Sequence, residues 1–189
     1  MASASGTGGP GTESEVPKLN LACGSDYRHG WLNLDIIAWP GWTRPDRIWD
    51  ARRDPLPVGD GEADEIYCGY TISHIAPGFH KTLLAEIYRA LSPLGFVVFS
   101  EVDMPLVMAK WMADPRDARV ADLIWGEQGN QHGLHLAEYD KHCQGFTEET
   151  LGELLTEVGF RKIRRVHIHS AAVWWELSLA CEKGRGDGL

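Results

Sequence analysis

The chain has 189 residues, of which 43% are hydrophobic, and a formal net charge of −9. This length and composition predict one globular domain with a buried core and exclude a wholly disordered chain. The acidic balance argues against a nucleic-acid partner, which requires a basic face. No apolar run reaches the roughly 18 residues of a membrane span, and the N-terminal residues lack the apolar run that a secretion signal requires. We therefore expect a cytoplasmic protein without a membrane partner.

The first segment of the chain is rich in glycine, serine and threonine. Residues 1–16 offer few apolar side chains to bury, so we expect a disordered leader. A single domain is expected over residues 17–184, followed by a short disordered tail over residues 185–189. The sequence has no feature that indicates the oligomeric state. The cysteines show no paired spacing, which predicts thiols in a reducing compartment rather than disulfides.

Short apolar runs predict five parallel strands in the first half of the domain. They cover Leu19–Cys23, Trp31–Ile36, Arg47–Asp50, Glu65–Cys68 and Phe96–Val102. Only about seven residues separate the first two strands, too few for an ordinary crossover helix. We therefore expect a single turn or a loop in this first crossover.

The segment Lys18–Asp35 reads KLNLACGSDYRHGWLNLD, two apolar strands joined through a tight turn at Ala22–Ser25. In a doubly wound α/β domain such a turn lies at the carboxyl edge of the sheet, where small residues let a ligand approach the backbone. Asp35, at the end of the second strand, can take both hydroxyls of a ribose. Neither glycine-rich phosphate-binding pattern is present, so a nucleoside without a pyrophosphate fits better than a dinucleotide.

Two amphipathic helices are predicted further along the chain. Phe79–Leu91 places its apolar residues on one helical face and is ended by Ser92 and Pro93. The last helix begins after Thr147, a good N-cap, and ends at Gly159, which suits the left-handed C′ position.

An insertion is expected between the fifth strand and the last helix, at about residues 104–145. Met104–Trp125 predicts one or two helices interrupted near Pro115, and Gly126–Gln144 is a long polar stretch with three histidines. Loops of this length in a compact domain are usually functional, so we expect this one to be the substrate lid.

The C-terminal runs Lys162–His169 and Val173–Glu182 are rich in β-branched and aromatic residues and predict an antiparallel hairpin that closes the sheet. The expected fold class is therefore α/β: a doubly wound, mostly parallel, Rossmann-like sheet with a C-terminal antiparallel hairpin and a shortened first crossover.

From about Leu19 to Lys183 the chain resembles the class I S-adenosylmethionine-dependent methyltransferases, and most closely a compact bacterial subgroup. The opening is similar to that subgroup's L-N-L-G-C-G followed by G-W-x-N-x-D. Further similar segments are Asp60–Tyr67 (DGEADEIY), Thr71–Ile75 (TISHI) at the family's L-E-H, Ile87–Gly95 (IYRALSPLG) at its Y-R-V-L-K-P-G-G helix end, and Phe146–Phe160 at its last helix.

The resemblance implies that the chain binds S-adenosylmethionine and releases S-adenosylhomocysteine. By position, the turn backbone would lie at the methionine moiety, Asp35 with Ile36 at the ribose, Asp50 with Ala51 at the adenine edge, and Gly69 with Tyr70 near the methyl group. The turn residues are Ala22, Cys23 and Gly24. Asp50 has a second interpretation as an ion-pair partner of the adjacent arginines.

A histidine in the polar stretch suits proton removal at neutral pH, because its unperturbed pKa is about 6.5. We select His142 first, since it precedes the last helix as in the resembling subgroup, and His74 second; either could instead be a surface or capping residue. His132, His135 and Asp140 with His142 also loosely resemble a metal site, but a third ligand with its supporting shell cannot be assigned from the sequence.

The predicted function is methyl transfer from S-adenosylmethionine to a small-molecule acceptor, in a biosynthetic pathway. Tryptophans near the insertion, Trp111 and Trp125, could wall an apolar pocket for a hydrophobic or aromatic acceptor. One alternative is a methyltransferase-fold protein that has lost transfer. It is motivated by Ala22, Ser73 and Leu94, which replace two glycines and the L-E-H glutamate that are usual in the family. A metal-dependent lyase or hydrolase is a third possibility.

Overall fold

A computed structural model describes residues 17–126, 137–169 and 173–184. The expected leader and tail lie outside the described residues, as do His132 and His135 of the possible metal site. The expected lid is described in part, with residues 127–136 left out.

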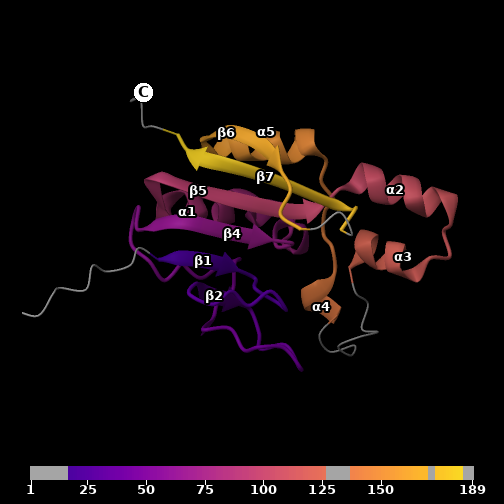
Figure 1. Cartoon of the computed structure of the whole chain (residues 1–189), viewed down its shortest axis with the longest axis horizontal. Helices are drawn as coiled ribbons and strands as arrows, with labels where there is room; N and C mark the ends of the chain where they lie inside the picture. Colours follow the sequence, from indigo (N-terminus) through magenta and orange to yellow (C-terminus); the bar gives the residue numbers. More distant parts are fainter. Residues whose placement is uncertain (1–16, 127–136, 170–172, 185–189) are drawn as a thin grey trace, which may run out of the picture.

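The domain is built on a seven-stranded mixed sheet in the order β3-β2-β1-β4-β5-β7-β6 (Figure 1). Strands β1 to β5 pair in parallel, and β7 pairs antiparallel with both β5 and β6. This confirms the predicted fold class. The strands are β1 Lys18–Leu21, β2 Leu32–Asp35, β3 Arg47–Ile48, β4 Ala63–Gly69, β5 Leu91–Val102, β6 Phe160–Val166 and β7 Glu176–Lys183.

The crossover between β1 and β2 is short, as predicted, and contains no helix. Two buried asparagines stabilise it: Asn20 donates to Oδ1 of Asn33 at 2.9 Å, and the backbone N–H of Arg28 donates to the same oxygen at 2.9 Å. The Cys23 N–H donates to the Leu34 carbonyl at 2.9 Å. These bonds hold the turn after β1 at the carboxyl edge of the sheet, without a helix to separate it from β2.

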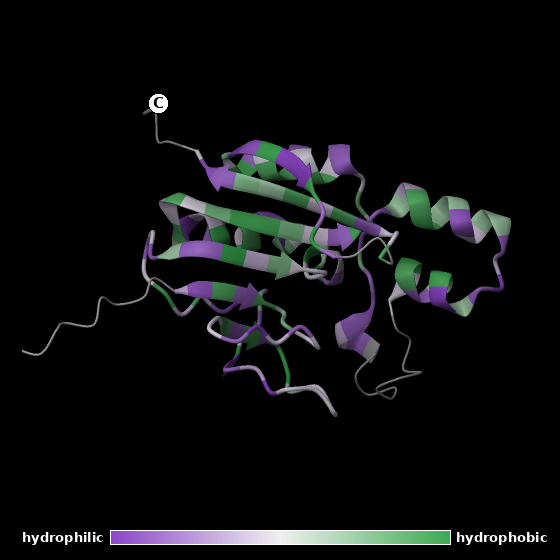
Figure 2. Cartoon of the chain, viewed as in Figure 1, coloured by the Kyte–Doolittle hydropathy of each residue, from purple (hydrophilic) through white to green (hydrophobic). Residues whose placement is uncertain are grey.

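Helices α1 (His80–Ala90) and α5 (Glu148–Val158) cover one face of the sheet (Figure 1). The buried residues Leu83, Leu84 and Ile87 recur at helical spacing in α1, and Figure 2 shows both apolar and polar residues on the helices behind the sheet. The predicted caps of α5 are confirmed: Oγ1 of Thr147 accepts from the Thr150 N–H at 3.1 Å, and Gly159 has φ +112°. The largest buried side chains of this core include Phe99, Phe146, Phe160, Leu19, Leu21 and Leu34.

The insertion forms two helices, α2 (Met104–Ala113) and α3 (Ala118–Trp125), which extend beyond the end of the sheet (Figure 1). The predicted break near Pro115 is confirmed. The rings of Trp111 and Trp125 meet edge to face at 5.6 Å. The remaining elements are the short α4 (Ala137–Asp140) and the single-turn 3₁₀ helices η1 (Ile72–His74) and η2 (Pro77–Phe79). Among the described helices, none has the length and apolar character needed to span a bilayer.

Candidate functional site

A cavity of about 350 Å³ opens where the carboxyl ends of β1, β2, β3 and β4 meet. Its volume is in the range of small-molecule sites, and the position is the usual one in open α/β sheets. We call residues 22–24, 35–36 and 50–51 the β1–β3 wall. The β4 wall consists of Gly69–Thr71 and His74, together with His169 from the link between β6 and β7.

The structure brings nearly all the predicted site residues together in this cavity. Every predicted cofactor-binding residue lines it, and so does His74, whereas His142 is not among the lining residues. Their roles in binding and catalysis stay predictions. The lining cofactor candidates are Ala22, Cys23, Gly24, Asp35, Ile36, Asp50, Ala51, Gly69 and Tyr70.

Asp35 is the central polar group of the β1–β3 wall. Its side chain is buried and accepts hydrogen bonds from the backbone N–H groups of Gly24 and Ile36, both at 2.7 Å. The indole N–H of Trp39 donates to the same carboxylate at 3.3 Å. Burial raises the pKa of Asp35 and outweighs these bonds, which lower it. Asp35 thus fixes the turn after β1 and still lines the cavity.

The turn after β1 has an unusual backbone. Ala22 has φ +50° and Gly24 has φ +48°, both in the left-handed region that favours glycine. A Cβ atom at Gly24 would lie 3.3 Å from the Trp42 ring, so the turn lies close against that side chain. Burial, and then Asp35, raise the pKa of Cys23 to about 12, so its thiol remains protonated at neutral pH.

Asp50 is already engaged by its neighbours. Its carboxylate accepts from Nε and Nη2 of Arg52, both at 2.8 Å, and lies 3.3 Å from Nε of Arg53. The hydrogen bonds from Arg52 hold the pKa of Asp50 below its usual value. The structure therefore contains the local ion pair that was the second interpretation of Asp50, although the residue also lines the cavity.

The two predicted histidines lie against each other. Their ring centroids are 4.7 Å apart, and Nδ1 of His74 is 3.2 Å from the Lys141 carbonyl oxygen. Nε2 of His74 lies 3.8 Å from a carboxylate oxygen of Asp140. Burial lowers the pKa of His74, and burial together with His74 lowers the pKa of His142 to about 4. Both imidazoles are therefore neutral at pH 7, and His142 supports His74 from outside the cavity.

A buried carboxylate lies behind the β4 wall. Glu101, on β5, is fully buried, and its Oε1 accepts from the backbone N–H groups of Ile72 and Ser73 at 2.7 and 3.3 Å. Burial raises the pKa of Glu101 to about 7 despite these hydrogen bonds. The carboxylate thereby caps η1, the turn that presents His74 to the cavity.

His169 was missed by the sequence analysis. It lines the cavity, and its Nδ1 contacts Oε2 of Glu176, the first residue of β7. Because β6 is antiparallel to the reversed strand β7, it runs in the same direction as β5, and its end lies at the same sheet edge as the cavity. The predicted hairpin already implied this direction, so residues following β6 could have been considered.

Residues 21–164 match the model of a methyltransferase-domain family. The chain belongs to this methyltransferase family. This confirms the prediction that the chain is a class I S-adenosylmethionine-dependent methyltransferase, and it identifies the chain as an enzyme. A search among curated proteins returned no significant match.

Solved methyltransferases share the fold. Human N-acetylserotonin methyltransferase, in complex with S-adenosylmethionine, is 17% identical with a TM-score of 0.56, covering 90% of this chain and 48% of that one. An S-adenosylmethionine-dependent methyltransferase from Archaeoglobus fulgidus is 14% identical with a TM-score of 0.59, covering 88% and 86%. The complex of DhpI with S-adenosylhomocysteine is 17% identical with a TM-score of 0.56, covering 89% and 76%. This methyltransferase thus spans about half the length of the human enzyme.

Proposed function

We propose that this methyltransferase transfers the methyl group of S-adenosylmethionine to a small-molecule acceptor, in a biosynthetic reaction. The observation that carries the proposal is Asp35: a buried carboxylate that lines the cavity directly beside the left-handed turn after β1. A carboxylate accepts hydrogen bonds from both hydroxyls of a ribose, and the turn lets a ligand approach the backbone.

The rest of the lining fits the same cofactor. Ile36 and Ala51 offer apolar contacts beside Asp35, as a purine ring requires. The polar residues Asn20 and Tyr67 also line the cavity.

The bound cofactor would supply an electrophilic methyl group on a sulfonium. The residues of this chain would place the acceptor and keep water out. Tyr70 and Thr71 continue the β4 wall from Gly69, and His74 contributes a neutral imidazole to the same wall. His142, predicted as the base, would position His74 through their ring contact.

Several features support a small acceptor. The cavity of about 350 Å³ is of the size that small ligands occupy. The net charge of −9 argues against a nucleic-acid substrate, because phosphate backbones bind basic surfaces. Tyr139 and Asp140 of α4 also line the cavity, which supports the proposal that the segment after α3 covers the acceptor.

The departures from the family motifs do not favour loss of transfer. Leu94 is 90% exposed and Ser73 is buried, and neither is among the lining residues. Ala22 lines the cavity but adopts the left-handed conformation for which glycine is usual at that position. Of the three, only Ala22 lines the described cavity, and it keeps the left-handed backbone of the turn.

Calorimetric titration of S-adenosylmethionine and S-adenosylhomocysteine tests the proposal. Replacing Asp35 with alanine removes a charged acceptor, so we expect binding to weaken by roughly 10- to 100-fold. The matched control is Asp114→Ala, an aspartate-to-alanine change at the end of α2. This variant should bind both ligands like the wild type. Circular dichroism confirms that each variant is folded. Failure of the folded wild-type protein to bind either ligand would overturn the proposed function.

A further inference from the structure

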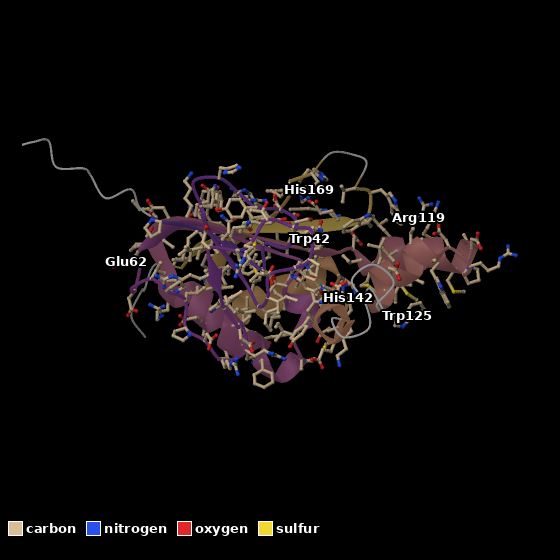
Figure 3. All side chains as sticks on the ribbon, turned by 90° about the horizontal axis from the view of Figure 1, so that it is seen from below. Trp42, Glu62, Arg119, Trp125, His142 and His169 are labelled. Carbon is tan, nitrogen blue, oxygen red and sulfur yellow. The ribbon has the colours of Figure 1, made fainter. Side chains whose placement is uncertain are left out.

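A histidine–carboxylate pair lies at the edge of the cavity, in a part of the chain for which no role has been predicted. Nδ1 of His169 contacts Oε2 of Glu176, and the side chain of His169 is 34% exposed whereas that of Glu176 is 7% exposed. His169 lines the cavity. In the view of Figure 3 the labels of His169 and His142 lie on opposite sides of that of Trp42.

Hydrogen bonds to both carboxylate oxygens hold the side chain of Glu176 in place. The Ser178 hydroxyl donates to Oε1 at 2.6 Å and the Ile168 N–H donates to it at 3.1 Å, while the Tyr70 hydroxyl donates to Oε2 at 3.3 Å. Burial raises the pKa of Glu176, but the hydrogen bonds of Ser178 and His169 outweigh it and lower the pKa overall. The group is therefore an anion at neutral pH. An anion beside Nδ1 selects the tautomer that carries its proton there, which leaves the Nε2 lone pair as a proton acceptor.

Tyr70 contacts both members of this pair and belongs to the β4 wall itself. It is the residue after β4 and has φ +50°, a strained conformation for a non-glycine residue. Its ring stacks on His169 with centroids 6.4 Å apart and lies 5.2 Å from Trp175. The strained backbone thus places an aromatic ring in the wall, with its hydroxyl on Glu176 and its ring beside His169.

Three described histidines lie near the cavity: His74, His142 and His169. They differ in whether a neighbouring carboxylate can stabilise the protonated imidazole. His142 is outside the lining, and burial and His74 lower its pKa to about 4, which makes it a weak base. Burial also lowers the pKa of His74, whose nearest carboxylate oxygen, on Asp140, is 3.8 Å away. A base must become charged when it takes a proton, and the carboxylate in contact with His169 stabilises that charge.

We propose that His169, oriented by Glu176, is the catalytic base, and that the acceptor is an aromatic hydroxyl. This proposal rests on the proposed methyl transfer. The hydroxyl oxygen forms the new bond to the methyl carbon, and the carbon–sulfur bond breaks with its electron pair remaining on sulfur. The hydroxyl proton moves to Nε2 of His169, and water later removes it.

The need for a base narrows the class of oxygen acceptor. A carboxylate acceptor carries no proton at neutral pH and would need no base. A phenolic hydroxyl has a pKa of about 10 in water, within reach of an imidazole, whereas an aliphatic hydroxyl is far less acidic. The ring of Tyr70, in the β4 wall beside His169, suits stacking against a flat aromatic acceptor.

The test measures methyl transfer from S-adenosylmethionine to phenol, 4-nitrophenol and benzoate. We expect transfer to both phenols and none to benzoate. His169→Asn should lower kcat for phenol by about 100-fold, the usual contribution of a general base. It should lower kcat for 4-nitrophenol, which is already partly ionised at neutral pH, by less than about tenfold. Glu176→Gln should show the same dependence on acceptor acidity with smaller losses, because Glu176 is a positioning residue.

The matched control is His167→Asn, the same change at an exposed histidine two residues before the proposed base. It should leave all rates unchanged. A second readout needs no turnover: with S-adenosylhomocysteine present, 4-nitrophenol should bind to the wild type as the coloured phenolate, and its phenolate fraction should fall in His169→Asn. Calorimetry should give the same S-adenosylhomocysteine affinity for all variants.

Equal losses for phenol and 4-nitrophenol in His169→Asn would indicate a structural role and overturn the assignment of the base. Wild-type protein that binds S-adenosylhomocysteine but methylates neither phenol, or methylates benzoate instead, would overturn the acceptor class. In each of these cases the proposed methyltransferase function survives. That function fails separately, if S-adenosylhomocysteine does not bind.

Discussion

The β1–β3 wall is held by hydrogen bonds between residues close together in the chain, whereas the β4 wall depends on residues far apart. Asp35 bonds to Gly24, 11 residues away, and to the adjacent Ile36. Tyr70 of the β4 wall bonds to Glu176, 106 residues away. The difference indicates that the β1–β3 wall, proposed to bind the cofactor, can be recognised as a local motif. The β4 wall, proposed to face the acceptor, forms only when β5, β6 and β7 have paired.

The largest expected effect is on stability, from replacing Glu101, which lies behind the β4 wall. Glu101→Ala would leave the buried N–H groups of Ile72 and Ser73 without their acceptor and open a cavity beneath η1. We expect the free energy of unfolding to fall by about 3–5 kcal/mol, measured by urea denaturation. In the fraction that stays folded, methyl transfer should suffer more than S-adenosylhomocysteine binding. Equal loss of both would show that the two walls are not independent.

Glu101→Gln separates the shape of this side chain from its charge. Burial raises the folded-state pKa of Glu101 from 4.5 to about 7, so between these values the folded state binds more protons than the unfolded state. The contribution of Glu101 to stability therefore falls as pH rises from about 4.5 to about 7. The glutamine variant lacks this dependence. Its stability relative to the wild type should rise by up to about 3 kcal/mol across the same window.

The same contrast explains which parts of the site could be predicted from the sequence. Asp35 and the turn after β1 belong to a strand–turn–strand segment whose apolar pattern and small residues were visible locally. Thr147 and Gly159 marked the last helix for the same reason. The predicted hairpin implied the direction of β6, but no local motif selects His169, because its contact with Glu176 forms only across the hairpin.

The predicted base illustrates the same limit. His142 has a suitable residue type and position, but the ring of His74 lies beside it, and His142 does not line the cavity. Glu101 lies near the end of the largely apolar strand β5, and no spacing rule connects it with Ser73. Their effects depend on burial, which raises or lowers a pKa only after the sheet and helices are assembled.

A moderate effect on ligand binding should distinguish the two aspartates of the β1–β3 wall, Asp35 and Asp50. The carboxylate of Asp50 is occupied by Arg52, whereas Asp35 bonds chiefly to backbone N–H groups. We expect Asp50→Ala to weaken S-adenosylhomocysteine binding by less than about tenfold, a smaller loss than for Asp35→Ala. Calorimetry of both variants under one set of conditions gives the ratio. Equal losses would mean that Asp50 binds the ligand directly.

The smallest effect concerns the backbone of the turn after β1. A left-handed conformation costs a non-glycine residue about 1–2 kcal/mol, and Ala22 has φ +50°. Glycine removes that cost but increases the conformational entropy of the unfolded chain, so Ala22→Gly should stabilise the protein by about 0.5 kcal/mol. The matched control is Ala76→Gly at φ −61°, where no strain is relieved and stability should fall by about 0.5–1 kcal/mol. Urea denaturation of both variants should therefore give changes of opposite sign. Changes of the same sign would mean that contacts of the Ala22 methyl group, rather than its backbone, determine the stability of this turn.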